Sequence, residues 1–235
     1  MKKILVGLLA VMVLLTGCGA PKKDKDVIDI GISQLVEFAA LDDCRDGFVK
    51  ALEDNGYKDG ENINIDYQNA QGDITVAQTI AKKFASDKKD LIFAIATPSA
   101  QAAYNATKKI PILISAVTDP VKAGIVNSLD TPGTNVTGTS DMNPVKQQLE
   151  LIKEFLPDAK NVGIIYNAAE PNSVVQVDIA KASAKELGLN VIEATVANTS
   201  EVNQAAQSLA GRVDAIYAPT DNAVASSIGA ILKVA

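Results

Sequence analysis

The amino-acid sequence contains no histidine and no tryptophan, and its 235 residues include only two cysteines, Cys18 and Cys44. Without histidine, the chain cannot build a Ser-His-Asp relay or a typical zinc site. It also lacks a Gly-x-Gly-x-x-Gly segment after a strand and a phosphate-binding loop that ends in Gly-Lys-Ser/Thr. These absences argue against an enzyme, and we predict neither a cofactor nor a metal site.

An excess of positive charge is also missing. The chain has 22 Lys and Arg residues against 28 Asp and Glu residues, which gives a formal net charge of −6. Proteins that bind DNA or RNA need clustered basic residues to neutralise phosphates, and no such cluster is present. Nucleic acid is therefore not an expected partner.

The first 20 residues have the pattern of a targeting segment. Lys2 and Lys3 form a positively charged start, and residues 4–15 are apolar but too few to span a bilayer. The sequence Leu-Thr-Gly-Cys at residues 15–18 resembles a bacterial lipobox, in which the cysteine is acylated and becomes the mature N-terminus. We predict a lipoprotein signal and the start of a tether, with Cys18 anchoring the protein to the extracytoplasmic face of the cell membrane. The alternative is an ordinary secretory signal with an incidental cysteine.

Cys44 is the second cysteine and lies in a segment predicted to be helical. Once Cys18 carries a lipid, Cys44 has no partner for an intramolecular disulfide. A nucleophilic role would need a nearby base, and the chain has no histidine. We interpret Cys44 as a packed thiol.

Strands and helices alternate through residues 26–140. The predicted strands are residues 27–33, 63–68, 91–96 and 112–117. The predicted helices are residues 41–55, residues 75–86, a helix that opens at residue 97, and residues 121–129. The unbroken apolar run at 91–96 is typical of a strand buried on both faces. This order predicts a parallel sheet with helices on both faces, which forms an N-terminal ligand-binding lobe over residues 26–140.

A turn-rich break at residues 130–135 and a short strand at 136–139 precede a second series. Its predicted helices are residues 145–155, 173–187 and 201–209 and a helix from residue 221, and its predicted strands are residues 161–166, 190–196 and 213–218. We expect a second lobe over residues 141–235, with a crossover near residues 138–143. The predicted fold class is α/β, with two doubly wound parallel-sheet lobes.

Five short strings carry a resemblance to a known family. They are GYKDGENI at 56–63, AVTDPVKAG at 116–124, PGTNVTG at 132–138, VGIIYN at 162–167 and PTDN at 219–222. Together and in this order they resemble ABC-transporter substrate-binding proteins of the tryptophan/tyrosine type. The resemblance implies an extracytoplasmic, monomeric receptor with a class I periplasmic-binding-protein fold, which delivers an aromatic or related amino acid to ABC permease subunits. Members of that family continue for several more elements, so we expect the second lobe to be partial.

Polar side chains gather where the predicted strands end, the edge at which open α/β sheets bind small ligands. The predicted binding residues are Ser33, Gln34, Phe38, Thr97, Ser99, Ala100, Gln101, Ser115, Thr118, Asp119, Thr139, Ser140, Asn167, Glu170, Asp221 and Asn222. Asp141 and Thr220 belong to the same strand-end strings, 139–141 and 220–222, but are not among the predicted binding residues. The alternative interpretation is that the Ser, Thr, Asp and Asn residues simply cap helices.

We expect two parts of this residue set, one in each lobe, to bind the two charged ends of an amino acid. Thr97 is expected to cap the helix that opens there, so that Ser99 and the N–H groups of Ala100 and Gln101 receive the ligand carboxylate. Asp221 from the opposite lobe is expected to pair with the ammonium group. Phe38 is the predicted stacking residue for the ligand side chain.

Other functions for such a pair of lobes stay open at this point. A repressor with the same lobes would carry an N-terminal helix-turn-helix, where this chain has a predicted lipoprotein signal. A receptor for a sugar or a nucleoside is the alternative that we retain. Sugar sites usually flank the ring with two aromatic side chains and several charged groups, and this sequence shows that pattern only weakly.

Overall fold

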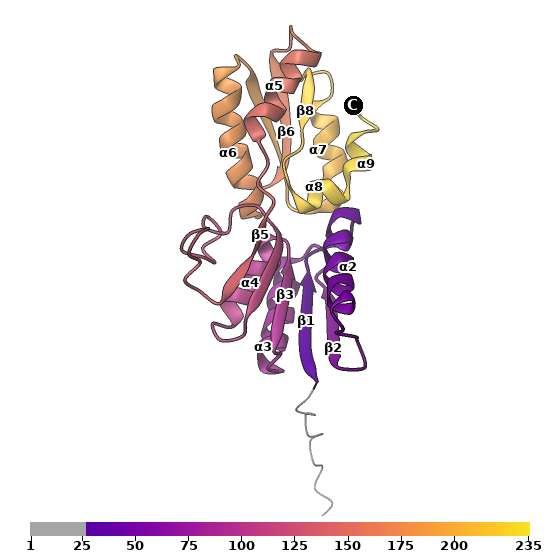
Figure 1. Ribbon diagram of the computed structural model, residues 1–235. Coiled ribbons are helices and arrows are strands. Elements are labelled where there is room, and N and C mark those ends of the chain that lie inside the picture. The colour runs from indigo at the N-terminus through magenta and orange to yellow at the C-terminus, as the bar shows by residue number, and fades with distance from the viewer. Residues whose placement is uncertain (1–26) are drawn as a thin grey trace, which may run out of the picture.

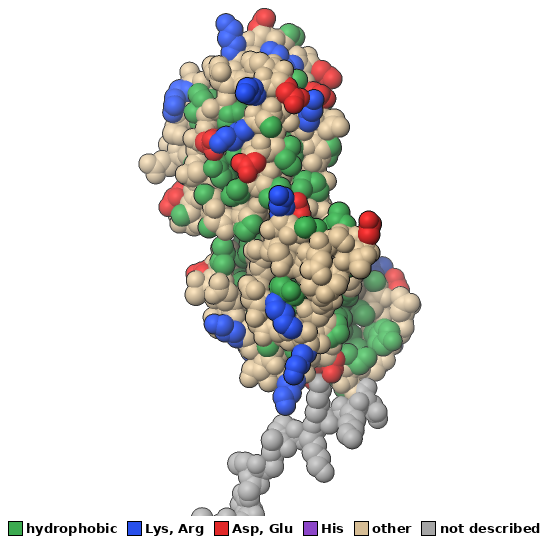
Figure 2. Space-filling model, turned by 90° about the vertical axis from the view of Figure 1, so that its left-hand side faces the viewer, with side chains coloured by type: hydrophobic (Ala, Val, Ile, Leu, Met, Phe, Trp, Pro, Cys, Tyr) green, Lys and Arg blue, Asp and Glu red, His purple; other side chains and the backbone are tan. Residues whose placement is uncertain are grey.

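A computed structural model describes residues 27–235, so the predicted signal and Cys18 lie outside the described residues. Two parallel sheets form two lobes, one above the other in Figure 1. In the space-filling view the lobes are two rounded bodies joined at a narrower waist (Figure 2). The predicted α/β class with two parallel-sheet lobes is confirmed.

The first lobe contains a five-stranded sheet in the order β2-β1-β3-β4-β5. Its strands are β1 (Ile28–Gln34), β2 (Ile63–Asn69), β3 (Leu91–Ile95), β4 (Ile112–Val117) and β5 (Val136–Ser140), and its helices are α2 (Ala39–Asp54), α3 (Ile74–Ser86) and α4 (Thr97–Ala106). All neighbouring strands are parallel. Consecutive residues 30–34 of β1 are buried, because helices cover both faces of the sheet.

The predicted helix over residues 121–129 is wrong, because this segment forms turns. The Asp119 carboxylate accepts hydrogen bonds from the backbone N–H groups of Val121 and Lys122, which holds the chain in a turn. Gly124 then adopts a positive φ of 71°, a conformation that glycine tolerates and a helix interior does not. The connection from β4 to β5 is therefore a loop.

The second lobe contains a three-stranded parallel sheet in the order β7-β6-β8. Its elements are α5 (Val145–Phe155), β6 (Asn161–Asn167), α6 (Pro171–Glu186), β7 (Asn190–Val196), the 3₁₀ helix η1 (Thr199–Glu201), α7 (Val202–Leu209), β8 (Ala215–Tyr217), α8 (Asn222–Ser226) and α9 (Ile228–Ile231). The last predicted strand is shorter than expected. The predicted helix from residue 221 is two short helices, since Ser227 leaves the helical region at φ −116° and ψ 17°.

A glycine in each central strand allows a helix to approach closely. A Cβ atom at Gly31 in β1 would lie 2.7 Å from the Phe84 ring of α3. A Cβ atom at Gly163 in β6 would lie 2.7 Å from the Leu209 side chain of α7. Phe84 and Leu209 are almost completely buried. The two lobes thus use the same packing device, in which a large apolar side chain occupies the space of a missing Cβ.

The chain passes between the lobes through residues 141–144, directly after β5. The Asp141 N–H donates to the Val117 carbonyl at 3.3 Å, and Asn143 Nδ2 donates to Thr220 Oγ1 at 2.6 Å. Helices α4 and α6 also contact each other across the lobes. No helix within residues 27–235 combines the length and the apolar character needed to cross a membrane.

Candidate ligand-binding site

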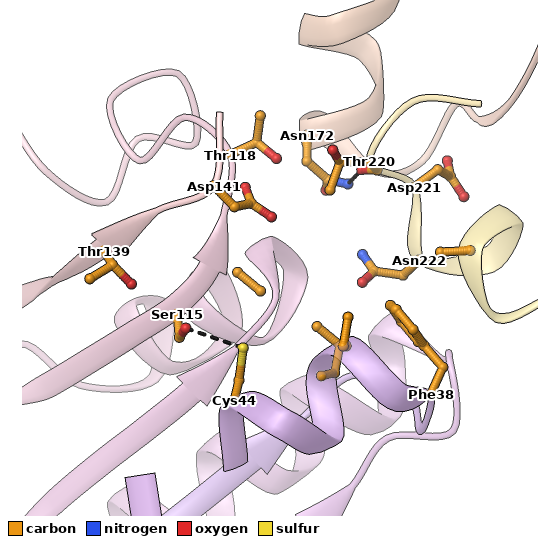
Figure 3. A pocket seen from close by; sticks show the side chains of 14 residues that line it. Phe38, Cys44, Ser115, Thr118, Thr139, Asp141, Asn172, Thr220, Asp221 and Asn222 are labelled. Atoms are coloured by element: carbon orange, nitrogen blue, oxygen red, sulfur yellow. Dashed lines mark hydrogen bonds between the residues drawn. The ribbon is translucent and has the colours of Figure 1, made fainter. Parts of the chain in front are cut away.

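A cavity of about 390 Å³ lies between the two lobes (Figure 3). Its size is within the range of about 300–1,000 Å³ that is usual for small-molecule sites. The first lobe and the crossover contribute Phe38, Ala40, Leu41, Cys44, Ser115, Ala116, Thr118, Thr139 and Asp141, and the second lobe contributes Asn172, Thr220, Asp221, Asn222 and Ala225. Both lobes therefore form its wall, at the carboxyl ends of the strands.

Asp141 and Thr118 lie next to each other on one side of the cavity (Figure 3). The Asp141 Oδ1 atom and the Thr118 Oγ1 atom have no hydrogen-bond partner among residues 27–235. Burial raises the pKa of the Asp141 carboxyl above its ordinary value of 3.8 by more than the neighbouring Thr118 hydroxyl lowers it, because a buried carboxylate is poorly solvated. The carboxylate can accept a hydrogen bond and the hydroxyl can donate one, so the two groups together fit a ligand end that carries both a donor and an acceptor.

The polar residues at the strand ends of the first lobe share this lack of partners. We call Ser33, Gln34, Thr97, Ser99, Thr118 and Asp141 the first-lobe rim. Each has a buried side-chain oxygen that makes no hydrogen bond within the described part of the chain. A buried polar atom without a partner typically costs about 1–3 kcal/mol. Of these six residues, Thr118 and Asp141 line the cavity, where a ligand can supply the missing hydrogen bond.

The start of α4 differs from the prediction. Ala96, not Thr97, is the N-cap residue, and it adopts φ 80° and ψ 152°, a strained region that is essentially restricted to glycine. The Ala100 N–H donates to the Ala96 carbonyl at 3.0 Å as the first helical bond, so it is not available to a ligand. The Gln101 side chain is also occupied, since its Nε2 donates to a carbonyl in the loop after β4. The N–H groups outside the helical ladder are those of Thr97 and Ser99.

Asp221 also differs from its predicted role. Its Oδ2 atom accepts hydrogen bonds from the Asn167 N–H and the Ser173 hydroxyl, both at 2.6 Å, and its Oδ1 atom accepts from the Val224 N–H at 2.9 Å. Figure 3 shows its carboxylate pointing away from Asp141. Because protein donors already occupy both oxygens of a side chain that is 1% exposed, Asp221 holds the strand end and is poorly placed to receive an ammonium group.

Glu170 is a second buried carboxylate that the second lobe satisfies itself. It accepts hydrogen bonds from Asn172 Nδ2 at 3.1 Å, from the Asn222 side chain and N–H, and from the Ala223 N–H at 3.3 Å. Burial, and then the negative charge of Asp221, raise the pKa of the Glu170 carboxyl. We call Asn167, Glu170, Asn172, Ser173, Gln176, Thr220, Asp221 and Asn222 the second-lobe rim.

The predicted residues fall into four groups. Those that line the cavity are Phe38, Ser115, Thr118, Thr139, Asp221 and Asn222. Asn167 and Glu170 line a smaller neighbouring pocket, while Asp119 and Ser140 bond to nearby backbone. Those that lie at the first-lobe strand ends or in α4 without lining the cavity are Ser33, Gln34, Thr97, Ser99, Ala100 and Gln101.

Sequence reasoning missed several lining residues. The polar ones are Cys44, Asp141, Asn172 and Thr220, and the apolar ones are Ala40, Leu41, Ala116 and Ala225. Asp141 and Thr220 each adjoin a predicted residue, so neighbourhood at a strand end was a usable signal. The apolar residues give no such signal, because an apolar residue on a helix or strand has the same pattern whether it faces a core or a cavity.

Comparisons with known proteins agree on one family. The family described as ABC transporter substrate binding protein matches residues 29–235. A protein named "Tyrosine-binding protein" from Clostridioides difficile (strain R20291) is 53% identical over 246 residues, which cover 99% of this chain and 70% of that protein.

Two solved structures resemble this chain to different degrees. An ABC domain from Streptococcus pneumonia in complex with L-Trp has a TM-score of 0.83 at 39% identity. A ligand-free, open substrate-binding protein with adhesive properties from Clostridium difficile has a TM-score of only 0.60, although its identity is 60%. Each comparison covers 88% of this chain and 70% of the other. The arrangement of the lobes is therefore closer to that of the tryptophan-bound protein than to that of the open one.

Proposed function

Because the chain belongs to the ABC transporter substrate-binding protein family, we propose that it binds an aromatic amino acid, tryptophan or tyrosine, between its two lobes and delivers it to the permease of an ABC importer. The observation that carries this proposal is the pair of Asp141 and Thr118. The Asp141 Oδ1 atom and the Thr118 hydroxyl, neither of which has a hydrogen-bond partner among residues 27–235, lie side by side in a cavity of suitable size. The names of the similar proteins support the choice of ligand.

The charged end of an amino acid complements this pair. The Asp141 carboxylate accepts hydrogen bonds from the ligand ammonium group, and the Thr118 hydroxyl donates to the ligand carboxylate. This assignment replaces Asp221 by Asp141 as the ammonium partner, because the oxygens of Asp221 are occupied by three protein donors. The burial that raises the pKa of Asp141 is then compensated by the ligand charge.

The rest of the cavity suits an aromatic side chain. Phe38 offers a ring, and Leu41 and Ala225 add apolar surface from the two lobes. A flat ring that contacts both lobes stabilises the closed arrangement over the open one, since only the closed state buries both of its faces. A sugar would need more hydrogen-bonding side chains and a second aromatic ring. Within residues 27–235, Phe38 is the only aromatic residue that lines the cavity.

A calorimetric titration of purified protein tests the proposal. The ligands are tyrosine, tryptophan, the decarboxylated amine tyramine, the deaminated acid 4-hydroxyphenylpropionate, a sugar and a nucleoside. We expect Asp141→Asn to weaken the amino acids and tyramine by roughly 10- to 100-fold, the size of a lost charge-assisted contact, and to affect the deaminated acid little. Asp119→Asn is the matched control, because Asp119 caps its own turn outside the cavity.

Two results would contradict the proposal. Binding of the sugar or the nucleoside without any aromatic amino acid would assign the cavity to another ligand. Equal losses for tyrosine, tyramine and the deaminated acid in Asp141→Asn would mean that Asp141 supports the fold and does not contact the ammonium group.

The cellular setting of the proposed function rests on the sequence. We propose residues 26–140 and 141–235 as the two ligand-binding lobes of a monomeric receptor, held at the extracytoplasmic face of the cell membrane by a lipid on Cys18. Residues 1–20, the predicted signal and tether start, lie outside the described residues. Labelling of cells with a fatty-acid analogue, followed by recovery of the protein, would check the anchor, and an unlabelled protein would contradict it.

A further inference from the structure

One part of the first-lobe wall of the cavity carries a polar pair. Ser115, near the end of β4, donates its hydroxyl hydrogen to the Cys44 sulfur of α2 at 3.4 Å (Figure 3). Both residues are only half-buried, and both line the cavity. Asp141 and Thr118 lie on the same first-lobe side of the cavity, above this pair in Figure 3. A ligand whose charged end contacts Asp141 can therefore direct its far end toward Ser115.

The hydrogen bond to Cys44 determines what Ser115 can offer a ligand. A serine hydroxyl has one hydrogen to donate and two lone pairs that accept. Because the Cys44 sulfur receives that hydrogen, the Ser115 oxygen is left as an acceptor. The Ser115 carbonyl is also used, since it accepts from the Ala96 N–H at 3.1 Å. The side-chain oxygen is thus the part of Ser115 that can respond to a ligand.

The surroundings make this acceptor selective. Leu41 and Ala116 next to the pair are apolar, so a ligand ring that covers the pair removes it from water. A ring that donates a hydrogen bond at its far end would satisfy the Ser115 oxygen, whereas a plain phenyl ring would leave that oxygen buried without a partner. Sites built in this way reject the analogue that lacks the donor.

We infer that Ser115, oriented by Cys44, is a specificity-determining residue that recognises a ring hydrogen-bond donor, either a phenol O–H or an indole N–H. This inference rests on the proposed function, because it needs an aromatic amino acid with its charged end at Asp141. It gives a physical reason why tyrosine and tryptophan would bind well and phenylalanine would not. Cys44 acts through Ser115 as a positioning residue.

The test compares matched ligand pairs by calorimetry. Tyrosine is compared with phenylalanine, and tryptophan is compared with its benzothiophene analogue, in which sulfur replaces the ring N–H. The measured quantity is the ratio of affinities within each pair. We expect both ratios to exceed about tenfold for the wild type and to fall about tenfold in Ser115→Ala, the usual size of one hydrogen bond to a buried group.

Further variants separate recognition from damage to the fold. Cys44→Ser keeps an acceptor for the Ser115 hydrogen, so the ratios should be retained, whereas Cys44→Ala should lower them even if Ser115→Ala fails to fold. Ser208→Ala is the matched control, because Ser208 is exposed on α7 and its hydroxyl donates to the nearby Ala205 carbonyl. Ratios that stay at the wild-type value in both Ser115→Ala and Cys44→Ala would overturn the inference while the proposed function stands. A wild type that binds none of the four ligands would overturn the proposed function itself.

Discussion

The first-lobe rim and the second-lobe rim lie beside the same cavity, but their polar side chains differ in how they are hydrogen-bonded. Both lie at the carboxyl ends of parallel strands, and both carry polar side chains that are removed from water. On the second-lobe rim, Glu170 and Asp221 together accept seven hydrogen bonds from the protein. On the first-lobe rim, every member has a side-chain oxygen without a partner among the described residues. Among the described residues, the chain satisfies Glu170 and Asp221 on the second-lobe rim, although Asn172 Oδ1 has no partner. On the first-lobe rim, Thr118 and Asp141 line the cavity, where a ligand can reach their unpartnered oxygens.

This difference implies that the second lobe provides a rigid wall and that the first lobe provides the groups that gain hydrogen bonds from a ligand. A network with satisfied hydrogen bonds is rigid and holds its shape without a ligand. Unpaired groups destabilise the ligand-free protein, and a ligand that pairs with them recovers that free energy as affinity. We therefore expect substitutions on the two rims to change stability in opposite directions.

The largest effect should come from the second-lobe rim. In Asp221→Asn, an amide nitrogen would face one of the N–H or O–H donors that now bond to the carboxylate. We expect the free energy of unfolding to fall by about 3 kcal/mol, as for the loss of charge-assisted bonds to a buried group. Urea unfolding measures this change, and affinity for all ligands should drop together. If Asp221→Asn kept the wild-type free energy of unfolding and lost affinity only for ligands with an ammonium group, Asp221 would be the partner of that group, as first predicted.

A smaller effect of opposite sign should come from the first-lobe rim. Thr118→Val removes a buried hydroxyl that has no partner, so we expect the ligand-free protein to gain about 1 kcal/mol. The affinity for tyrosine should fall by roughly five- to tenfold, because the donor to the ligand carboxylate is lost. Ser140→Ala is the matched comparison, since the Ser140 hydroxyl donates to the Thr118 carbonyl at 2.7 Å and its loss should destabilise. Destabilisation by both variants, measured in urea, would contradict the account.

Much of the fold follows from local sequence patterns. The run at 91–96 predicts a strand buried on both faces, and β3 is buried from Ile92 to Ile95. The helix expected at 121–129 failed because a side-chain bond from Asp119 and the conformation of Gly124 favour turns over helix. Whether such a segment forms a helix or turns depends on side-chain hydrogen bonds to the backbone, and the spacing of apolar residues does not reveal these bonds.

The site was less predictable than the fold. The strand-end rule pointed to the edge of the sheet at which the cavity lies, and the predicted residues Ser115 and Thr118 line that cavity. It could not tell Asp141 from Asp221, because both are acidic residues that follow a strand. What distinguishes them is whether protein donors reach their oxygens, and that depends on residues far away in the sequence, such as Asn167 and Ser173 for Asp221.

The most direct test of the account is the stability of the ligand-free Asp141→Asn variant as a function of pH. Because burial raises the pKa of Asp141 in the folded state, the folded wild type binds more protons than the unfolded chain between the ordinary value of 3.8 and the raised value. The contribution of Asp141 to the free energy of unfolding of the wild type therefore falls as the pH rises through that window. Asparagine does not titrate, so the free energy of unfolding of Asp141→Asn should increase relative to that of the wild type as the pH rises over the same range.

The measurement is the free energy of unfolding in urea, for wild type and Asp141→Asn, near pH 4 and near pH 8. We expect the variant to be the more stable protein near pH 8, with a gap that narrows near pH 4 and reverses when tyrosine is added. A variant that is less stable than the wild type at both pH values, as expected for Asp221→Asn, would show that Asp141 supports the fold and would contradict the account.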